Sequence, residues 1–247
     1  MACPSDALWL SVNPSLRHFD QRLCRLLRRH VEIQYWSYHQ TPDEPCSIET
    51  AVTLLHDYLK HRSVPIHLIG HGVSGAVALL YARLHPSRVK SLTLLGVGAN
   101  PAISWHTQYY ALRNNLPCNR QMILMQMARI LFGAIGSKKL TGIARVLVKN
   151  LDTELSSHSL IEHRNFESGG VEVPILVCNG AFDTIIDPNE HARWQPYLNS
   201  GDRLWTCQKG RHFFHHSHAS QVNPIIVDFW QRATSPFART ALIEVIS

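Results

Sequence analysis

Three glycines, Gly70, Gly72 and Gly75, form a Gly-x-Gly-x-x-Gly run between an apolar stretch and a helix-like stretch. A strand, a glycine turn and a helix in this order can cradle the pyrophosphate of a dinucleotide, provided that an acidic residue about 20 positions later holds the ribose. The sequence has no Asp or Glu between Gly75 and Asn150. A dinucleotide-binding oxidoreductase is therefore kept only as a third hypothesis.

Ser74, Asp183 and His212 have the side-chain types of nucleophilic catalysis, in which a histidine takes the proton of an attacking hydroxyl and an acid orients the histidine. Ser74 lies two positions after Gly72, a rotation of about 200° along a helix, which turns its side chain away from the glycine turn. Three hypotheses stay open: Ser74 as nucleophile, a His212–Asp183 pair as general base, and the same pair as a structural remnant. His212, His215, His216 and His218 have no local carboxylate or cysteine beside them, so neither a metal ion nor another cofactor is predicted.

Strand-like and helix-like segments alternate along most of the chain and position these residues. This alternation predicts an α/β fold, with a mostly parallel sheet and helices on both faces. Asn13–Pro14 and Ser47 are typical of helix starts. The six expected strands cover residues 7–12, 31–39, 65–70, 89–98, 173–180 and 202–208. One helix is expected after each of the first three strands. Three further helices are expected over residues 120–136, 138–151 and 222–233.

The alternation stops between residues 101 and 168, where only helices are expected. We predict a core of residues 1–100 and 169–247 and a helical cap subdomain of residues 101–168. The cap helices either pack on the sheet or bind an apolar ligand or a protein partner. Lys138 and Lys139 would then face an acidic partner or a membrane surface. The candidate apolar contacts are Trp105, Tyr109, Tyr110, Met125 and Phe132.

The chain of 247 residues has a net charge of +6, and residues 101–165 alone carry +5, from eight Lys or Arg against Asp152, Glu154 and Glu162. Nucleic-acid binding is not expected, because no long basic run or nucleic-acid motif is present. Six cysteines are scattered without pairing, which favours a reducing compartment. No apolar run is long enough for a membrane span, and a cytoplasmic protein is expected.

Three motifs in order resemble the α/β-hydrolase fold family. Gly70-His71-Gly72-Val73-Ser74-Gly75 looks like the turn that carries the family's nucleophile, VPILVCNGAFDTIIDP like its acid segment, and KGRHFFHHSHASQVNPIIVDFW like its histidine segment. The resemblance covers most of the chain, except for the family's first two strands, and suggests a bacterial branch of cyanobacterial type. It implies that Asp183 and His212 are the triad acid and histidine. It also implies that Val73, with Val12 and Asn13 in the loop after the first strand, supplies oxyanion-like N–H groups.

The departure from the family is the nucleophile itself, because Gly72 stands where the serine should be. Glycine adopts the strained backbone of this turn freely, so the loss of the hydroxyl leaves the fold intact. Pro14 has no N–H to add to the oxyanion hole. We therefore expect a non-hydrolytic binding or interaction module. The alternative is an active esterase- or lipase-like hydrolase, or a lyase, that uses Ser74 or the His212–Asp183 pair.

Overall fold

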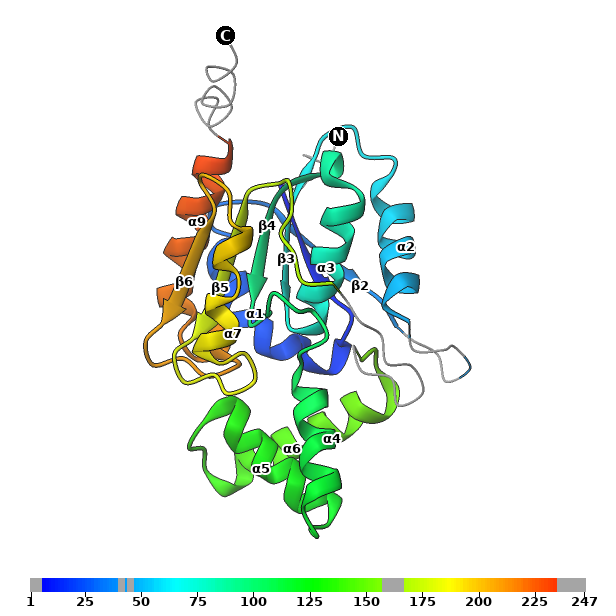
Figure 1. The fold of residues 1–247 in the computed structure, drawn as a ribbon, viewed down its shortest axis with the longest axis vertical. Coiled ribbons are helices and arrows are strands. Elements are labelled where there is room, and N and C mark those ends of the chain that lie inside the picture. Colours follow the sequence, from blue (N-terminus) through cyan, green and yellow to red (C-terminus); the bar gives the residue numbers. More distant parts are fainter. Residues whose placement is uncertain (1–5, 40–42, 44–46, 157–166, 235–247) are drawn as a thin grey trace.

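The computed structural model describes residues 6–39, 43, 47–156 and 167–234, and its centre is a six-stranded sheet (Figure 1). The strand order is β2-β1-β3-β4-β5-β6, and all neighbouring strands run parallel. The strands are β1 (Ala7–Ser11), β2 (Ile33–Ser37), β3 (Ile66–His71), β4 (Val89–Leu95), β5 (Ile175–Gly180) and β6 (Arg203–Cys207). The predicted fold class and all six predicted strands are confirmed.

The two faces of the sheet contribute to separate apolar cores because successive strand side chains point to opposite faces. In β1, Leu8 and Leu10 join one core, whereas Ala7 and Trp9 join the other. A parallel sheet covered on both faces is apolar along the whole strand, and every residue of β1 is buried.

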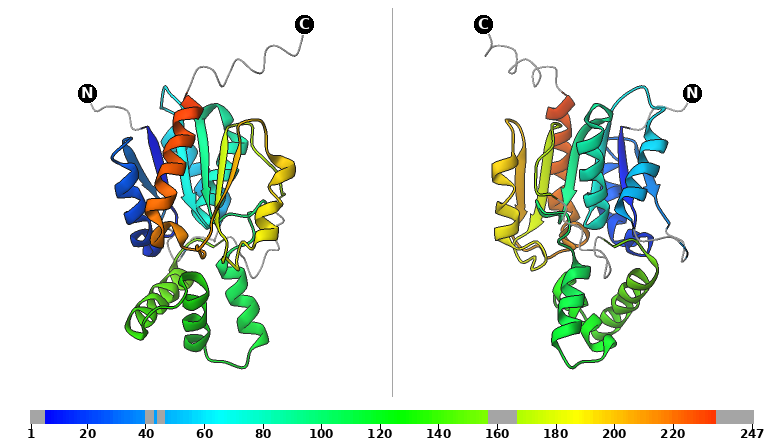
Figure 2. Two further views of the ribbon diagram at one scale, coloured as in Figure 1. Left: turned by 90° about the vertical axis from the view of Figure 1, so that its left-hand side faces the viewer. Right: turned by 45° about the vertical axis from the view of Figure 1, so that its right-hand side comes forward.

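Helices cover both faces of the sheet (Figure 2). The first face carries α2 (Ile48–Leu59), α3 (Val73–Leu84) and the short α7 (Pro188–Ala192), and the second carries α1 (Arg17–Leu27), α8 (Phe214–Ser217) and α9 (Ala219–Thr234). Single 3-10 turns lie at Pro14–Leu16 (η1), Pro86–Arg88 (η2) and Gln195–Tyr197 (η3).

The two predicted helix starts have different outcomes. Ser47 caps α2 as predicted, since its hydroxyl accepts the N–H of Thr50 at 3.2 Å. Asn13 is the N-cap residue of the 3-10 turn η1, with Pro14 at its first position, but the Asn13 side chain makes no cap hydrogen bond and instead donates to the carbonyl of Leu155 at 2.8 Å. The predicted start at Asn13–Pro14 is thus confirmed in position, whereas the side-chain cap is absent because a partner 142 residues away takes the Asn13 amide.

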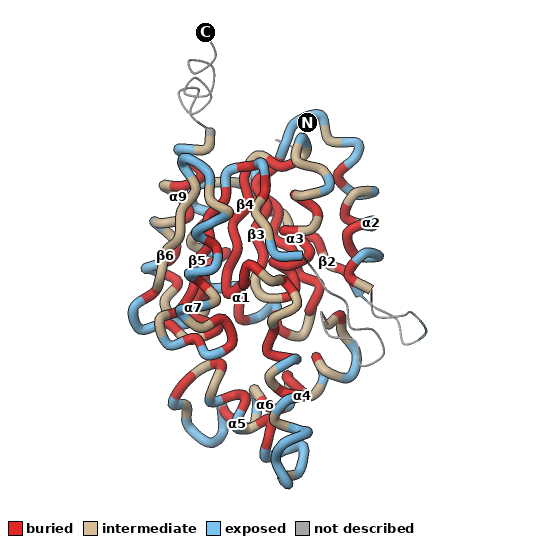
Figure 3. Tube along the Cα trace, viewed as in Figure 1, coloured by how far each residue is buried: buried red, intermediate tan, exposed pale blue. Residues whose placement is uncertain are grey.

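Between β4 and β5 the described residues, which leave out 157–166, form three helices, and we call these the helical insertion: α4 (Trp105–Asn115), α5 (Arg120–Phe132) and α6 (Ser137–Thr153). They lie beyond the carboxyl ends of the strands (Figure 1). Buried positions concentrate in the sheet and on the inward sides of the helices (Figure 3). A third apolar core joins the insertion to the sheet domain, and in it the ring of Phe132 stacks on Phe213 with centroids 4.4 Å apart.

Hydrogen bonds also tie the end of α6 to the loop after β1. Glu154 accepts the N–H and the hydroxyl of Ser15 at 2.8 and 2.9 Å, and it also accepts the amide of Asn150 at 2.6 Å. The amide oxygen of Asn150 in turn contacts Nε2 of His106 at 2.7 Å. These bonds hold the insertion over the loop that follows β1.

None of the described helices combines the length and the apolar character that a membrane span requires. The described cysteines, Cys24, Cys118, Cys178 and Cys207, carry free thiols. Cys3 and Cys46, with Glu162 and Arg164 of the basic segment, lie outside the described residues.

Candidate active site

The loops that follow β3, β4 and β5 meet at one edge of the sheet, because these strands are in matched register. His71, the last residue of β3, lies opposite Leu95, and Leu95 lies opposite Cys178. In open parallel sheets, the loops that carry catalytic and ligand-binding residues lie at this carboxyl edge.

Gly72 forms the turn between β3 and α3. Its backbone has φ 52° and ψ −124°, and its N–H donates to the carbonyl of Leu95 at 3.0 Å. This positive φ is open to glycine and costly for other residues. A Cβ built on Gly72 would have one neighbour within 4 Å, His212 Nε2 at 4.0 Å. The direction of the missing side chain is therefore open and is aimed at an imidazole nitrogen.

The other two glycines of the run are needed for close packing of α3 on β3. A Cβ on Gly70 would lie 2.7 Å from the backbone nitrogen of Gly75, and a Cβ on Gly75 would lie 2.9 Å from the carbonyl oxygen of Gly70. Atoms never approach so closely without a shift of the backbone. Helix–strand packing thus accounts for Gly70 and Gly75 without a bound phosphate.

His212 and Asp183 form a buried pair, as the order of the motifs led us to expect. His212 Nδ1 lies 2.9 Å from Asp183 Oδ2, and both side chains are at most 2% exposed. The other carboxylate oxygen of Asp183 accepts the N–H groups of Ile185 and Ile186 at 2.8 and 3.2 Å. These bonds fix the acid, and the acid fixes the ring, so that Nε2 of His212 faces Gly72.

Nε2 of His212 is buried and has no hydrogen-bond partner among the described residues. A buried polar atom is nearly always hydrogen-bonded in a native protein. The site therefore offers one unsatisfied nitrogen next to an open space, the arrangement that a hydroxyl, a water molecule or a ligand oxygen would complete.

A second buried histidine–carboxylate pair lies beside the first. His215 Nε2 is 3.0 Å from Asp20 Oδ1, and the other oxygen of Asp20 accepts the indole N–H of Trp9 at 3.1 Å. His71 lies between the two pairs, with its ring centroid 4.4 Å from that of His215 and 4.8 Å from that of His212. Burial lowers the pKa of His71 well below its usual value, and the neighbouring imidazoles lower it further. His71 is thus neutral and packs the site together.

Ser74 lies in the first turn of α3, with its hydroxyl accepting the N–H of Val12 at 3.1 Å. Among the described residues, no hydrogen bond joins Ser74 or Val12 to His212, and the N–H of Val12 is engaged by Ser74. The N–H groups of Val73 and Asn13 have no acceptor among the described residues. Val73 is the predicted oxyanion-like donor with the most suitable position. It directly follows Gly72 at the start of a twelve-residue helix, where the helix dipole favours negative charge.

The residues predicted to bind an apolar ligand or a partner fall into two groups. Trp105 and Tyr109 are buried in the core that joins the helical insertion to the sheet domain, and half-buried Tyr110, Met125 and Phe132 pack against that core. Lys138 and Lys139 are exposed on α6. The apolar members thus contribute to packing, whereas contact of the two lysines with a partner or a membrane stays a prediction.

Gly96, at the end of β4, is a site residue that the sequence did not reveal. Its φ is 60°, and a Cβ there would lie 3.2 Å from His71 Nε2 and 3.3 Å from His212 Cε1. Glycine at this position lets both imidazoles approach the strand end. Within residues 6–39, 43, 47–156 and 167–234, no group of three or more His, Cys, Asp or Glu is arranged to hold a metal ion.

Comparisons with known proteins agree with this geometry. The family model for the alpha/beta hydrolase fold matches residues 59–147. An uncharacterized protein of the cyanobacterium Synechocystis is 39% identical over 224 residues, which cover 91% of this chain and 89% of that protein. An uncharacterized protein of the cyanobacterium Nostoc is 35% identical over 240 residues, which cover 97% of this chain and 96% of that protein.

Among solved structures, a serine hydrolase of Cycloclasticus zankles is similar with a TM-score of 0.65. The match covers 93% of this chain and 90% of that one, at 16% identity, and therefore concerns the fold alone. The parallel sheet, the turn at Gly72 and these comparisons lead to one conclusion. The chain belongs to the α/β-hydrolase fold family.

Proposed function

We propose that this protein is a non-hydrolytic member of its family that binds a ligand over Gly72. The observation that carries the proposal is the unsatisfied Nε2 of His212, which lies 4.0 Å from the position of a Cβ on Gly72. With no side chain on Gly72, an acyl-enzyme cannot form there. A ligand oxygen in the open space would hydrogen-bond Nε2 of His212 and the N–H of Val73.

Two features argue against the alternative functions, the first against acyl transfer and the second against a dinucleotide-binding oxidoreductase. The hydroxyl of Ser74 accepts the Val12 N–H in the first turn of α3, so it is held in a structural hydrogen bond. The glycine run is accounted for by packing, which removes the main reason for a dinucleotide. Saturable binding of NAD or NADP, measured by fluorescence, would favour the dinucleotide-binding oxidoreductase over the proposed function.

A second candidate rests on the intact His212–Asp183 pair. A histidine held by an acid and facing open space can act as a general base on water or on a bound substrate, without a covalent intermediate. This reading predicts turnover that depends on His212 but not on Ser74.

The test compares p-nitrophenyl acetate turnover by the wild type with that of Gly72→Ser, Gly72→Ala, Ser74→Ala and His212→Ala. We expect no turnover by the wild type above that of Gly72→Ala. Gly72→Ser should gain an acetyl adduct in intact-mass measurements, and the additional change His212→Ala should abolish it. Wild-type turnover lost in Ser74→Ala would refute the proposal, and wild-type turnover lost only in His212→Ala would establish the general-base candidate.

Binding is tested with 2-phenylacetamide, which joins an apolar body to a carbonyl with no ready leaving group. Nitrogen-15 resonances of the His212 imidazole should shift saturably as the probe is added to the full chain. Gly72→Ser should weaken the shift, because the new hydroxyl takes the place of the ligand oxygen. Unshifted resonances in the wild type would contradict binding over Gly72.

A further inference from the structure

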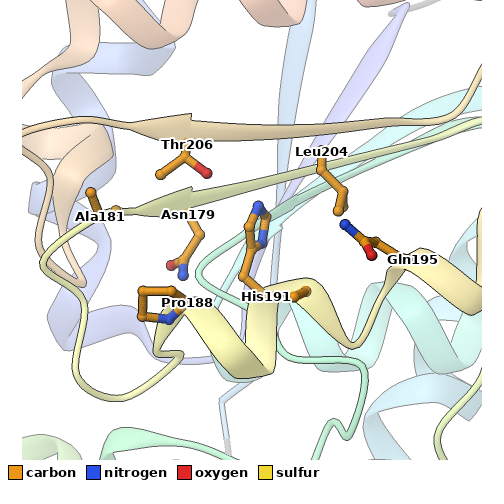
Figure 4. A pocket seen from close by; sticks show the side chains of 9 residues that line it. Asn179, Ala181, Pro188, His191, Gln195, Leu204 and Thr206 are labelled. Atoms are coloured by element: carbon orange, nitrogen blue, oxygen red, sulfur yellow. The ribbon is translucent and has the colours of Figure 1, made fainter.

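A pocket that is lined by neither Gly72 nor His212 opens between β5, β6 and α7 (Figure 4). Its volume is about 280 Å³, near the lower end of small-molecule sites. Polar side chains of Asn179, His191, Gln195 and Thr206 line it, with Leu204 and Pro188 among its apolar walls.

Asn179, which lines this pocket, carries an unsatisfied acceptor. The residue is 1% exposed, and its amide nitrogen donates to the carbonyl of Ile186. That bond fixes the orientation of the Asn179 side-chain amide, because only its nitrogen can donate to a carbonyl. The amide oxygen has no partner among the described residues. Since it can only accept, it is satisfied only by a hydrogen-bond donor.

His191 presents two more unsatisfied atoms. The residue is 8% exposed, and neither ring nitrogen has a partner among the described residues. Burial lowers the pKa of His191, against an opposing effect of Asp183, and a neutral imidazole offers one N–H donor and one acceptor. These groups are complementary to a molecule that both donates and accepts hydrogen bonds.

The charge of the pocket limits the ligand further. No Asp, Glu, Lys or Arg is among its lining residues. A charged ligand would lose its hydration without gaining a counter-charge, which is unfavourable. Hydroxyl groups, which donate and accept, match Asn179, His191, Thr206 and Gln195.

We propose that this pocket binds an uncharged, hydroxyl-rich molecule of monosaccharide size through Asn179 Oδ1, the ring of His191 and the hydroxyl of Thr206. The site is independent of the function proposed for Gly72, because neither Gly72 nor His212 lines it. The competing occupant is solvent alone, since about nine water molecules of about 30 Å³ would fill the same volume.

Isothermal titration of the full chain with D-glucose, D-galactose and myo-inositol tests the proposal, with D-gluconate and D-glucosamine as charged counterparts. At least one uncharged probe should bind saturably, and the charged counterparts should bind more weakly. Thr206→Val, which keeps the shape and removes the hydroxyl, should weaken binding roughly threefold to tenfold. Thr53→Val, on the exposed side of α2, is the matched control and should leave binding unchanged.

The location is tested by nitrogen-15 resonances of the imidazoles, with His191→Phe used for assignment. The bound probe should shift the His191 nitrogens and leave those of His212 in place. The proposal is overturned if no uncharged probe binds, which leaves solvent as the occupant. It is equally overturned if Thr206→Val binds as well as the wild type, or if His212 shifts in place of His191.

Discussion

The turn at Gly72 predicts that serine is tolerated better than alanine at this position. A residue with a side chain at φ 52° stores about 1–3 kcal/mol of strain, and the loss of glycine's freedom in the unfolded chain returns about 0.4–1 kcal/mol. Gly72→Ala should therefore lower stability by about 1–2 kcal/mol. At about 2–4 °C per kcal/mol for a chain of this size, Tm should fall by about 2–8 °C.

Gly72→Ser carries the same strain but can donate a hydrogen bond to the unsatisfied Nε2 of His212, close to the new side chain. A net gain of about 0.5–1.5 kcal/mol should place its Tm about 1–6 °C above that of Gly72→Ala. Thermal unfolding followed by circular dichroism at pH 7.5 measures both shifts. Gly72→Ser should have the higher Tm even if the serine hydroxyl also rotates toward other hydrogen-bond partners.

Gly142→Ala is the matched control, because Gly142 lies within α6 and a Cβ there meets nothing within 4 Å. It should raise Tm, by about 1–4 °C, since alanine favours a helix by about 0.5–1 kcal/mol. The reasoning is refuted if Gly72→Ala is as stable as the wild type, which would mean that the turn is unstrained. It is also refuted if Gly72→Ser is no more stable than Gly72→Ala, which would mean that Nε2 of His212 does not face Gly72.

Three further predictions concern buried polar groups. Burial lowers the pKa of His67 from 6.5 to about 3, so the unfolded chain binds more protons and stability falls as pH falls below 6.5; between pH 7.5 and 5.5 this group alone costs about 1.4 kcal/mol. Urea unfolding at the two pH values should show a smaller difference for His67→Asn. Asp20→Asn cannot accept from both Trp9 and His215 and should lower stability by about 1–3 kcal/mol, measured by urea unfolding, whereas the exposed Asp57→Asn should change it little. Glu154→Gln should speed amide exchange at Ser15 and at the end of α6 by hydrogen–deuterium exchange, and unchanged protection would show that the bonds to Glu154 are not formed in solution.

Local sequence patterns were sufficient to predict the strands of the sheet and most of the helices. Strands such as β1 and β5 are apolar except at their carboxyl ends, and the Ser47 cap depends on a residue three positions away. The pairing of His212 with Asp183 was expected from motif order. The structure adds what motifs cannot carry, namely that Nε2 of His212 is unsatisfied and faces Gly72.

Contacts between distant segments escaped sequence reasoning. The side chain of Asn13 bonds Leu155, and His215 pairs with Asp20 from 195 residues away. Neither pairing leaves a periodic pattern. The pocket beside His191 escaped for the same reason, because β5, α7 and β6 each contribute only a few of its atoms.

The bond network at the loop after β1 has a consequence for how the chain folds during its synthesis. Ser15 is synthesised before its partner Glu154, which follows 139 residues later. At about 5–20 residues per second, the loop waits about 7–28 s for that partner. His212, which faces Gly72, emerges later still. The candidate site therefore closes only after His212 has been synthesised, and a chain truncated before α6 would present the sheet edge uncovered.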